Sequence, residues 1–409
     1  MSSNRRDFLR LAAAGGAGLF FMPTELRAFG AHGAHGQNDR RLVLIFLEGG
    51  NDGLNTVVPF EDARYYAARP KLGQRGAGLV RLDEVTALHS QLAPWRGLWD
   101  NGRLAVLRSV GYERQDRSHF VSRDIWHSGL REDKNRATGW VARALERAVM
   151  AKGALPPVAL GTDEAPLLLH GTERSGLTIT DLNAFRVQVS EEERAARQRA
   201  LDAGAESGKG GALADRIAST AASAYATAET MRLAVERIPE GAGYPDQDLA
   251  ARLRLIARLC RAEGGPPVLW TRLGGFDTHA AQEGTQAALL GQLAGATSAF
   301  LADLARDGAD QRLLVLIYSE FGRRVHENGS AGTDHGSAAP MFALGGGVRG
   351  GIVGKPSNLD DLLDGDERAQ TDMRAVFSEA LRDWMGWPAA GIFDGACADG
   401  RANAGYLSS

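Results

Sequence analysis

Acidic, histidine and serine side chains recur in five short polar stretches of the sequence, and their chemistry suits a metal site. The stretches are "EGGNDG" with Asp52, "ERQDRSHF" with Ser118 and His119, "GGFDTHA" with Asp277 and His279, "SEFGRR" with Glu320, and "GTDHGS" with Asp334 and His335. Carboxylate and imidazole ligands suit Zn, Mn or a related divalent ion. Mixed sites of this kind hold one or two ions that activate a nucleophile and stabilise an oxyanion.

Each stretch, taken alone, also has an ordinary structural explanation. Asp52 in "NDG" is a natural turn former, and Ser118 suits the cap of a helix, where it would satisfy free backbone N–H groups. Glu320 could form a structural ion pair with Arg323 or Arg324. The recurrence of five compatible stretches, rather than any one of them, favours a shared site.

The polar stretches lie next to short apolar runs that predict buried strands. These runs are aliphatic, too short for helices, and broken by glycine or a polar group, and they lie at 42–47, 104–112, 266–277, 312–322 and 339–347. Longer helical patterns lie between them, at 92–100, 118–128, 139–151, 247–263, 282–306 and 372–386. This alternation predicts an α/β fold, a doubly wound and mostly parallel sheet with helices on both faces. In such sheets ligands bind outside the carboxyl ends of the strands, where the polar stretches would meet.

The overall composition is that of a globular protein with a sizeable core. The chain has 409 residues, of which 44% are apolar and 24% charged, and its formal net charge is −3. No Pro/Gly/Ser linker or charge block divides it, so we predict a single domain over residues 32–409. The small net charge gives no reason to expect nucleic acid, which is bound through clustered Lys and Arg.

The first 31 residues resemble a twin-arginine export signal. Arg5 and Arg6 precede an uncharged stretch from 11 to 22. A membrane-spanning helix needs about 20 apolar residues, and because this stretch is shorter and no later one is long enough, we expect no stable membrane span. The interpretation implies passage through the twin-arginine translocation machinery to the periplasm or the medium. A short buried N-terminal helix is the alternative, and the cleavage position stays open.

Two further features stay open in the sequence. The stretch from about 184 to 246 is rich in Ala and charge, and it predicts a peripheral helical insertion that fits either a lid over the site or a solvated face. Cys260 and Cys397 are the only cysteines, so no disulfide framework holds the fold. Whether the two pair depends on a distance that the sequence does not give.

Several stretches together resemble a known family. They are "FLEGGNDGLNTVVP", "RSHFVSRDIWHSG", "GGFDTHAAQ", "SEFGRRVHENGSAGTDHGSAAPMFALGG" and "TDMRAVFSEALRDWMG". They look like the exported bacterial proteins of domain-of-unknown-function family 1501 (DUF1501). That family is grouped with the alkaline phosphatase and sulfatase superfamily. The resemblance therefore implies an alkaline phosphatase-like fold and metal-dependent hydrolysis or transfer of phosphate or sulfate esters, on a small-molecule or polymer substrate.

The resemblance also implies roles for particular residues. Ser118 matches the nucleophile, and we expect His119 or Arg323 to stabilise charge on the transferred group. The expected ligands of one or two divalent ions are Asp52, Asp277, His279, Glu320, Asp334 and His335.

Two departures from the family pattern keep a second hypothesis open. Phe321 stands where phosphatases carry a histidine, so a second ion lacks a ligand unless His119 or Asp334 replaces it. The "RSHF" around Ser118 lacks the sulfatase signature for a formylglycine. The alternative is a non-catalytic exported binding or assembly protein that retains the fold.

Overall fold

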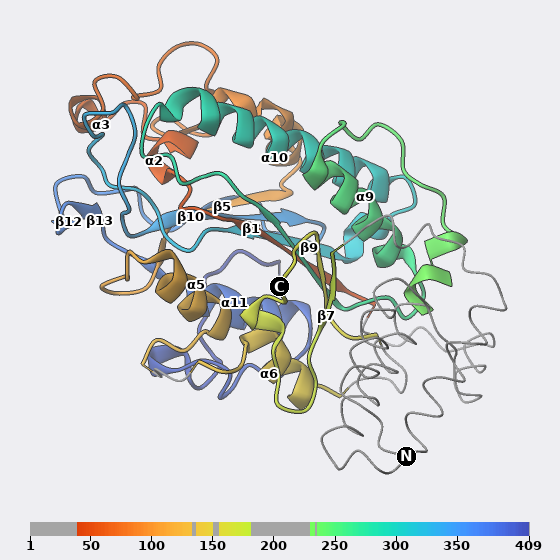
Figure 1. The fold of residues 1–409 in the computed structure, drawn as a ribbon. Coiled ribbons are helices and arrows are strands. Elements are labelled where there is room, and N and C mark those ends of the chain that lie inside the picture. The colour runs from red at the N-terminus through yellow and green to blue at the C-terminus, as the bar shows by residue number, and fades with distance from the viewer. Residues whose placement is uncertain (1–38, 133–135, 150–154, 181–229, 234, 409) are drawn as a thin grey trace, which may run out of the picture.

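The computed structural model describes residues 39–132, 136–149, 155–180, 230–233 and 235–408. The expected export signal and most of the expected helical insertion therefore lie outside the described residues. In the described part of the chain, a nine-stranded sheet has the order β11-β5-β10-β9-β1-β8-β6-β7, with β14 paired to β5. Helices cover it on both sides (Figure 1).

The five longest strands of this sheet match the apolar runs of the sequence, and four short strands were not predicted. The nine strands are β1 (Arg41–Leu47), β5 (Leu104–Gly111), β6 (Val158–Leu160), β7 (Leu177–Ile179), β8 (Val268–Leu273), β9 (Leu313–Tyr318), β10 (Ala339–Gly345), β11 (Gly351–Val353) and β14 (Thr371–Asp372). Two small sheets are formed by β2 (Val57–Val58), β3 (Val80–Arg81) and β4 (Ala87–Leu88), and by β12 (Leu362–Leu363) and β13 (Asp366–Glu367). The mixed, mostly parallel α/β sheet expected from the sequence is confirmed.

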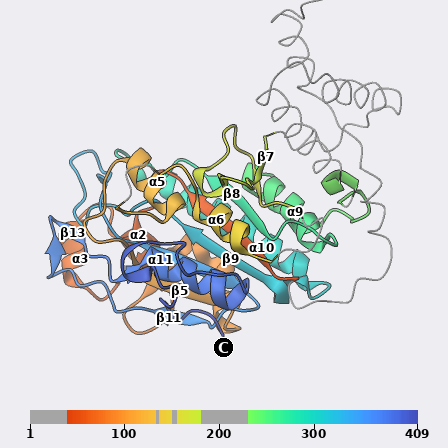
Figure 2. The same ribbon diagram turned by 90° about the horizontal axis from the view of Figure 1, so that it is seen from below.

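Strand β1 lies at the centre of the sheet and shows how its two faces are buried. Alternate side chains point to opposite faces of a strand. Val43 and Ile45 belong to one apolar core and Leu44 and Phe46 to the other. The first core contains side chains of α9 (Asp248–Arg261) and α10 (Gln282–Ala305), and the second those of α5 (His119–Ser128), α6 (Trp140–Arg147) and α11 (Met373–Glu379). Figure 2 shows the latter group together on one side of the sheet.

The remaining helical elements are short. They are α2 (Gly53–Thr56), α3 (Ala63–Ala68), α4 (Arg96–Asp100), the 3-10 turns Ser90–Trp95, Leu167–Leu169, Ala309–Arg312 and Gly395–Cys397, and the π-helical turn Ala380–Trp384. The helical pattern at 372–386 is therefore α11 continued by a π turn, and the pattern at 92–100 begins within a 3-10 turn that contains Pro94.

The direction of β10 determines which residues meet at the edge of the sheet where the candidate site lies. β10 is antiparallel to both its neighbours, β5 and β9, whereas every other strand pair of the large sheet is parallel. The start of β10 therefore lies at the edge where the parallel strands end. Residues that precede β10 are thus brought to the same edge as residues that follow β1, β5, β8 and β9.

Helix α10 corrects the expectation that no segment after the leader is long and apolar enough to span a membrane. Among the described residues it is the one helix long and apolar enough to cross a membrane, judged by length and composition. Its most apolar window is 56% buried inside the protein, and it packs against α9 and the 3-10 turn at Ser90–Trp95. These are the contacts of a core helix.

The structure also answers the question about the two cysteines. Cys260 belongs to the core that contains α9, and Cys397 to the core on the opposite face of the sheet. Both thiols are free and buried. The two cysteines therefore do not pair.

Candidate metal centre

Three segments bring the candidate ligands together at the carboxyl edge of the sheet. His119 is the first residue of α5, which follows β5. Asp277 and His279 follow β8, and His335 shortly precedes β10. Because β10 runs against its neighbours, His335 reaches the same edge as the residues that follow the other strands.

The four side chains converge on one small volume, and we call them the histidine cluster. One ligand atom each from His119, Asp277 and His335 lie within 4.8 Å of one another. Asp277 Oδ1 lies 3.1 Å from Nε2 of His335 and 3.1 Å from Nε2 of His279, and its Oδ2 lies 3.5 Å from Nε2 of His119. Nε2 of His279 is 3.0 Å from Nε2 of His335. Three imidazole nitrogens thus meet around one carboxylate.

The other ring nitrogen of each histidine is already hydrogen-bonded to an oxygen. The Nδ1–oxygen pairs are His119 with Glu320 Oε1 at 2.8 Å, His335 with the Arg117 carbonyl at 2.8 Å, and His279 with Asp334 Oδ1 at 3.1 Å. A carbonyl or carboxylate oxygen accepts, so each neutral ring carries its proton on Nδ1 and leaves the lone pair on Nε2. Metal-ligating histidines are held in this way. The residues present therefore fit a divalent metal ion.

His119 adds an unsatisfied atom to this arrangement. Its Nε2 is buried and has no hydrogen-bond partner in the described part of the chain. A buried polar atom without a partner costs stability and calls for an explanation, of which an ion is one. The hydrogen bond to Glu320 raises the pKa of His119 against the opposing effect of burial.

Asp277 is the charged member of the cluster. Partial burial alone would raise its pKa, but the hydrogen bond and charge of Arg323, together with the contact to His335, lower that pKa to about 2. The carboxylate is therefore ionised at neutral pH, as a metal ligand must be.

Arg323, expected to stabilise charge on a substrate, is used inside the protein. It is fully buried, and its Nη2 lies 2.6 Å from Asp277 Oδ1. Its other bonds go to backbone carbonyls, among them those of Gly50 at 2.7 Å, Thr333 at 2.8 Å and Phe276 at 3.0 Å. Arg323 thus ties together the loops that carry the cluster.

Glu320 and Asp334, expected as ligands, stand behind the histidines. Glu320 is 1% exposed, and its Oε1 accepts from the Gly49 N–H at 2.9 Å as well as from His119. Its Oε2 accepts from the Gly50 N–H at 3.3 Å. Asp334 is exposed and bonds His279, and a hydrogen bond from Asn328 leads the causes that lower its pKa. Both carboxylates orient imidazole rings.

Asp52 belongs to a different group, which we call the Asp52 cluster: Asp52, Arg69, Gln282 and Gln286. Asp52 caps α2, where its side chain accepts from the Asn55 N–H, and it forms an ion pair with the fully buried Arg69. Gln282 donates to the same carboxylate, and Gln286 donates to the Asp52 carbonyl at 3.1 Å. Every oxygen of Asp52 is thus occupied, and the residue is not part of the histidine cluster.

A family model described as "Protein of unknown function (DUF1501)" matches residues 105–382. The chain belongs to this family. The matched range holds the whole histidine cluster, whereas Asp52 lies before it. No curated protein matches the sequence of this DUF1501 member.

Several solved structures are similar to this DUF1501 member in overall arrangement, at low identity. The C-terminal periplasmic domain of EcEptC from Escherichia coli in complex with Zn has a TM-score of 0.43 and 9% identity, covering 90% of this chain and 87% of that one. The alkaline phosphatase from the Antarctic bacterium TAB5 has a TM-score of 0.32 and 9% identity, covering 76% and 93%. The PsFucS1 sulfatase from Pseudoalteromonas sp. has a TM-score of 0.34 and 11% identity, covering 93% and 72%. At this distance no activity is transferred from them.

Ser118 and Phe321 complete the surroundings of the histidine cluster. Ser118 occupies the N-cap position of α5, is exposed, and makes no capping hydrogen bond through its side chain. Phe321 is fully buried, and its ring lies 4.8 Å from the ring of His119 and 4.8 Å from that of His335. The cluster therefore has an apolar floor and a hydroxyl-bearing residue next to His119.

The sequence reasoning missed the partners of Asp52 and one partner of the histidines. Gln282 and Gln286 are spaced four apart on α10, which would place both amides on one helix face and was a usable signal. Arg69 carried no such signal, because it lies in a stretch whose residue types resemble those of a protein surface. The Arg117 carbonyl, which accepts a hydrogen bond from His335, is a backbone atom, and residue types give no sign of it.

Proposed function

We propose that this protein is an exported, metal-dependent hydrolase or transferase that acts on phosphate or sulfate esters. The observation that carries the metal part is the shared orientation of three histidines, each with Nδ1 on an oxygen and Nε2 toward Asp277. The reaction class rests on the resemblance of the sequence motifs to the alkaline phosphatase and sulfatase superfamily. Export by the twin-arginine route to the periplasm or the medium rests on the leader sequence.

The donor set supports one divalent ion rather than two. His119, Asp277 and His335 offer three mutually close ligand atoms, and His279, whose Nε2 lies 3.0 Å from that of His335, is a fourth candidate; such a set suits Zn or Mn. Glu320 and Asp52, which a second ion would need, are committed to other partners, and Phe321 fills the remaining side. An ion bound there would supply Lewis-acid stabilisation of ester oxygens and lower the pKa of a nearby hydroxyl.

Ser118 is the nucleophile in this proposal. It lies next to His119 at the start of the ten-residue helix α5, where free backbone N–H groups and the helix dipole favour an anionic group. Its hydroxyl attacks the phosphorus or sulfur atom of the ester and displaces the alcohol. Water then hydrolyses the seryl ester, or a second alcohol accepts the group.

A non-catalytic protein that keeps the ion is the second candidate, and Arg323 and Phe321 favour it. Arg323 forms its hydrogen bonds with the Asp277 carboxylate and with backbone carbonyls, which leaves it less available to a substrate. Phe321 has no hydrogen-bond donor with which to stabilise the charge that develops on a transferred group. The described cluster is thus better suited to hold an ion than to stabilise a transferred group.

A panel of aryl phosphate monoesters, phosphate diesters and sulfate esters tests the proposal on the metal-loaded full chain. We expect turnover of at least one ester, and a loss of roughly a thousandfold or more in Ser118→Ala. Ser175→Ala, at another exposed serine, should keep full activity. Metal-loaded protein that turns over no ester would establish the non-catalytic candidate, and equal activity of Ser118→Ala and wild type would remove Ser118 as nucleophile.

A further inference from the structure

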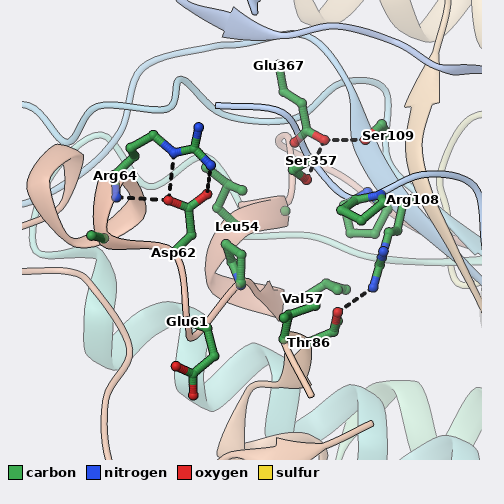
Figure 3. A pocket seen from close by; sticks show the side chains of 16 residues that line it. Leu54, Val57, Glu61, Asp62, Arg64, Thr86, Arg108, Ser109, Ser357 and Glu367 are labelled. Carbon is green, nitrogen blue, oxygen red and sulfur yellow. Dashed lines mark hydrogen bonds and ion pairs between the residues drawn. The ribbon is translucent and has the colours of Figure 1, made fainter. Parts of the chain in front are cut away.

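A cavity of about 390 Å³ lies beside α2 and α3, and none of the histidine cluster lines it. Its volume is in the range that small-molecule sites occupy. Much of the wall is apolar, formed by Leu54, Val57, Pro59, Val85 and Pro340. Figure 3 shows the labelled polar side chains of the wall around Leu54 and Val57.

Arg108 supplies one polar wall with unfilled hydrogen-bond donors. It comes from β5, and its side chain is only 8% exposed. Nη2 donates to the Thr86 hydroxyl, as Figure 3 shows, and lies 3.4 Å from Asp83 Oδ2. Nε and Nη1 make no hydrogen bond with the described residues. Burial lowers the pKa of Arg108, because its charge is poorly solvated. An anion bound in the cavity would stabilise this buried positive charge.

Glu367 forms another wall, and its carboxyl is hydrogen-bonded to two serine hydroxyls rather than to Arg108. Its Oε1 accepts from the hydroxyls of Ser109 and Ser357, and no ion pair joins it to Arg108. Burial raises the pKa of Glu367, which favours the neutral acid. Ser109 holds its side chain there with a backbone φ of 49°, in the left-handed region. Strain of this kind in a residue other than glycine is concentrated at ligand sites.

The other charges at the cavity are balanced or exposed. Asp62 is held by Arg64 through two hydrogen bonds of 2.8 Å, shown in Figure 3. Glu61 is exposed. Arg108, which is paired with Asp83 only through Nη2 at 3.4 Å, is therefore the cation that a ligand would meet inside the cavity.

We propose that this cavity binds a small carboxylic acid with an apolar chain, its carboxylate on Arg108 and its chain against Leu54, Val57 and Pro340. A planar carboxylate matches the fork of a single guanidinium. A phosphate dianion fits less well, because one buried arginine would have to balance two charges. The site thus differs in chemistry from the ester site proposed at the histidine cluster, and it does not depend on that proposal.

Calorimetric titration of the full chain with hexanoate, hexylamine and hexyl phosphate tests this site. We expect hexanoate to bind more tightly than both others, and Arg108→Gln to weaken it by about tenfold or more. Ala63→Trp, which places a bulky ring at the exposed rim formed by α3, should abolish binding while the protein stays folded. Arg96→Gln, which removes an exposed arginine on α4, is the matched control and should bind like wild type.

The results that overturn the proposal are equally definite. They are no hexanoate binding at millimolar concentration, stronger binding of the amine or phosphate, or unchanged binding in both Arg108→Gln and Ala63→Trp. His335→Ala, which disrupts the histidine cluster, should leave hexanoate binding unchanged. Loss of binding in that variant would show that the ligand sits at the histidine cluster instead.

Discussion

The histidine cluster and the Asp52 cluster lie at the same edge of the same sheet, yet their hydrogen bonding is opposite. In the Asp52 cluster every carboxylate oxygen has a donor, and the Arg69 guanidinium finds further acceptors in the carbonyls of Arg324 and Val325, each at 2.9 Å. In the histidine cluster, Nε2 of His279 and Nε2 of His335 face each other at 3.0 Å, and the buried Nε2 of His119 has no hydrogen-bond partner among the described residues.

The difference separates a structural polar group from a binding site. A buried polar network is stable when each member is satisfied, and it then fixes the fold. Acceptors that face one another are stable only with a cation or protons between them. Each cluster is built around an aspartate that follows a strand of the same sheet, and what distinguishes the two is whether the polar atoms around that aspartate are satisfied.

The largest expected effect comes from breaking the Asp52 cluster. Asp52→Ala leaves Arg69 buried without its carboxylate, and we expect the free energy of unfolding to fall by about 3–5 kcal/mol. Denaturant unfolding measures this, with Asp100→Ala, at the exposed pair with Arg96, as a control that costs less than about 0.5 kcal/mol. Folded Asp52→Ala should still bind metal. A loss as small as that of the control would contradict the structural role.

A second test concerns His127, a histidine of the core that lies outside the histidine cluster. His127 is buried among aromatic rings, including Phe46 at 5.4 Å between centroids, and burial lowers its pKa to about 3. Because its pKa in the unfolded chain is near 6.5, the folded state binds fewer protons between those values. Its contribution to stability is complete above pH 6.5 and is lost, by roughly 1.4 kcal/mol per pH unit, as pH falls toward 3.

The variant His127→Phe should flatten that pH dependence. Unfolding measured from pH 7 to pH 4 should show a smaller loss of stability in the variant than in wild type. Identical slopes in the two proteins would mean that His127 is protonated as easily in the fold as in the unfolded chain.

A smaller effect is expected from the carboxylate behind His119. Glu320→Gln weakens the bond that orients the imidazole, and we expect metal affinity to fall by about 10- to 100-fold. Competition with a chromophoric chelator measures the affinity. Unchanged affinity would contradict the orienting role of Glu320.

The smallest effect is expected at Asp334. Its side chain is 56% exposed, so water can replace it as the partner of His279. Asp334→Asn should therefore reduce metal affinity by less than about tenfold. A loss greater than that of Glu320→Gln would make Asp334 a ligand rather than a support.

Much of the fold could be predicted from the sequence, because aliphatic runs such as 42–47 and 312–322 are buried on both faces of the sheet. The reversed direction of β10 could not, since apolar composition carries no direction. It is nevertheless what brings His335 to the site. Ser118, His119, Asp277, His279 and His335 could be selected as candidates by residue type. The separation of Asp52 from them could not, because it depends on contacts with Arg69 and with Gln282, which lies in a remote part of the chain.

Elemental analysis of the purified, folded protein tests the central claim most directly. We predict about one equivalent of a divalent metal in wild type and in folded Asp52→Asn, and close to none in His335→Ala and Asp277→Ala. Full metal content in His335→Ala, or loss of metal in Asp52→Asn while the protein stays folded, would contradict the assignment of the site to the histidine cluster.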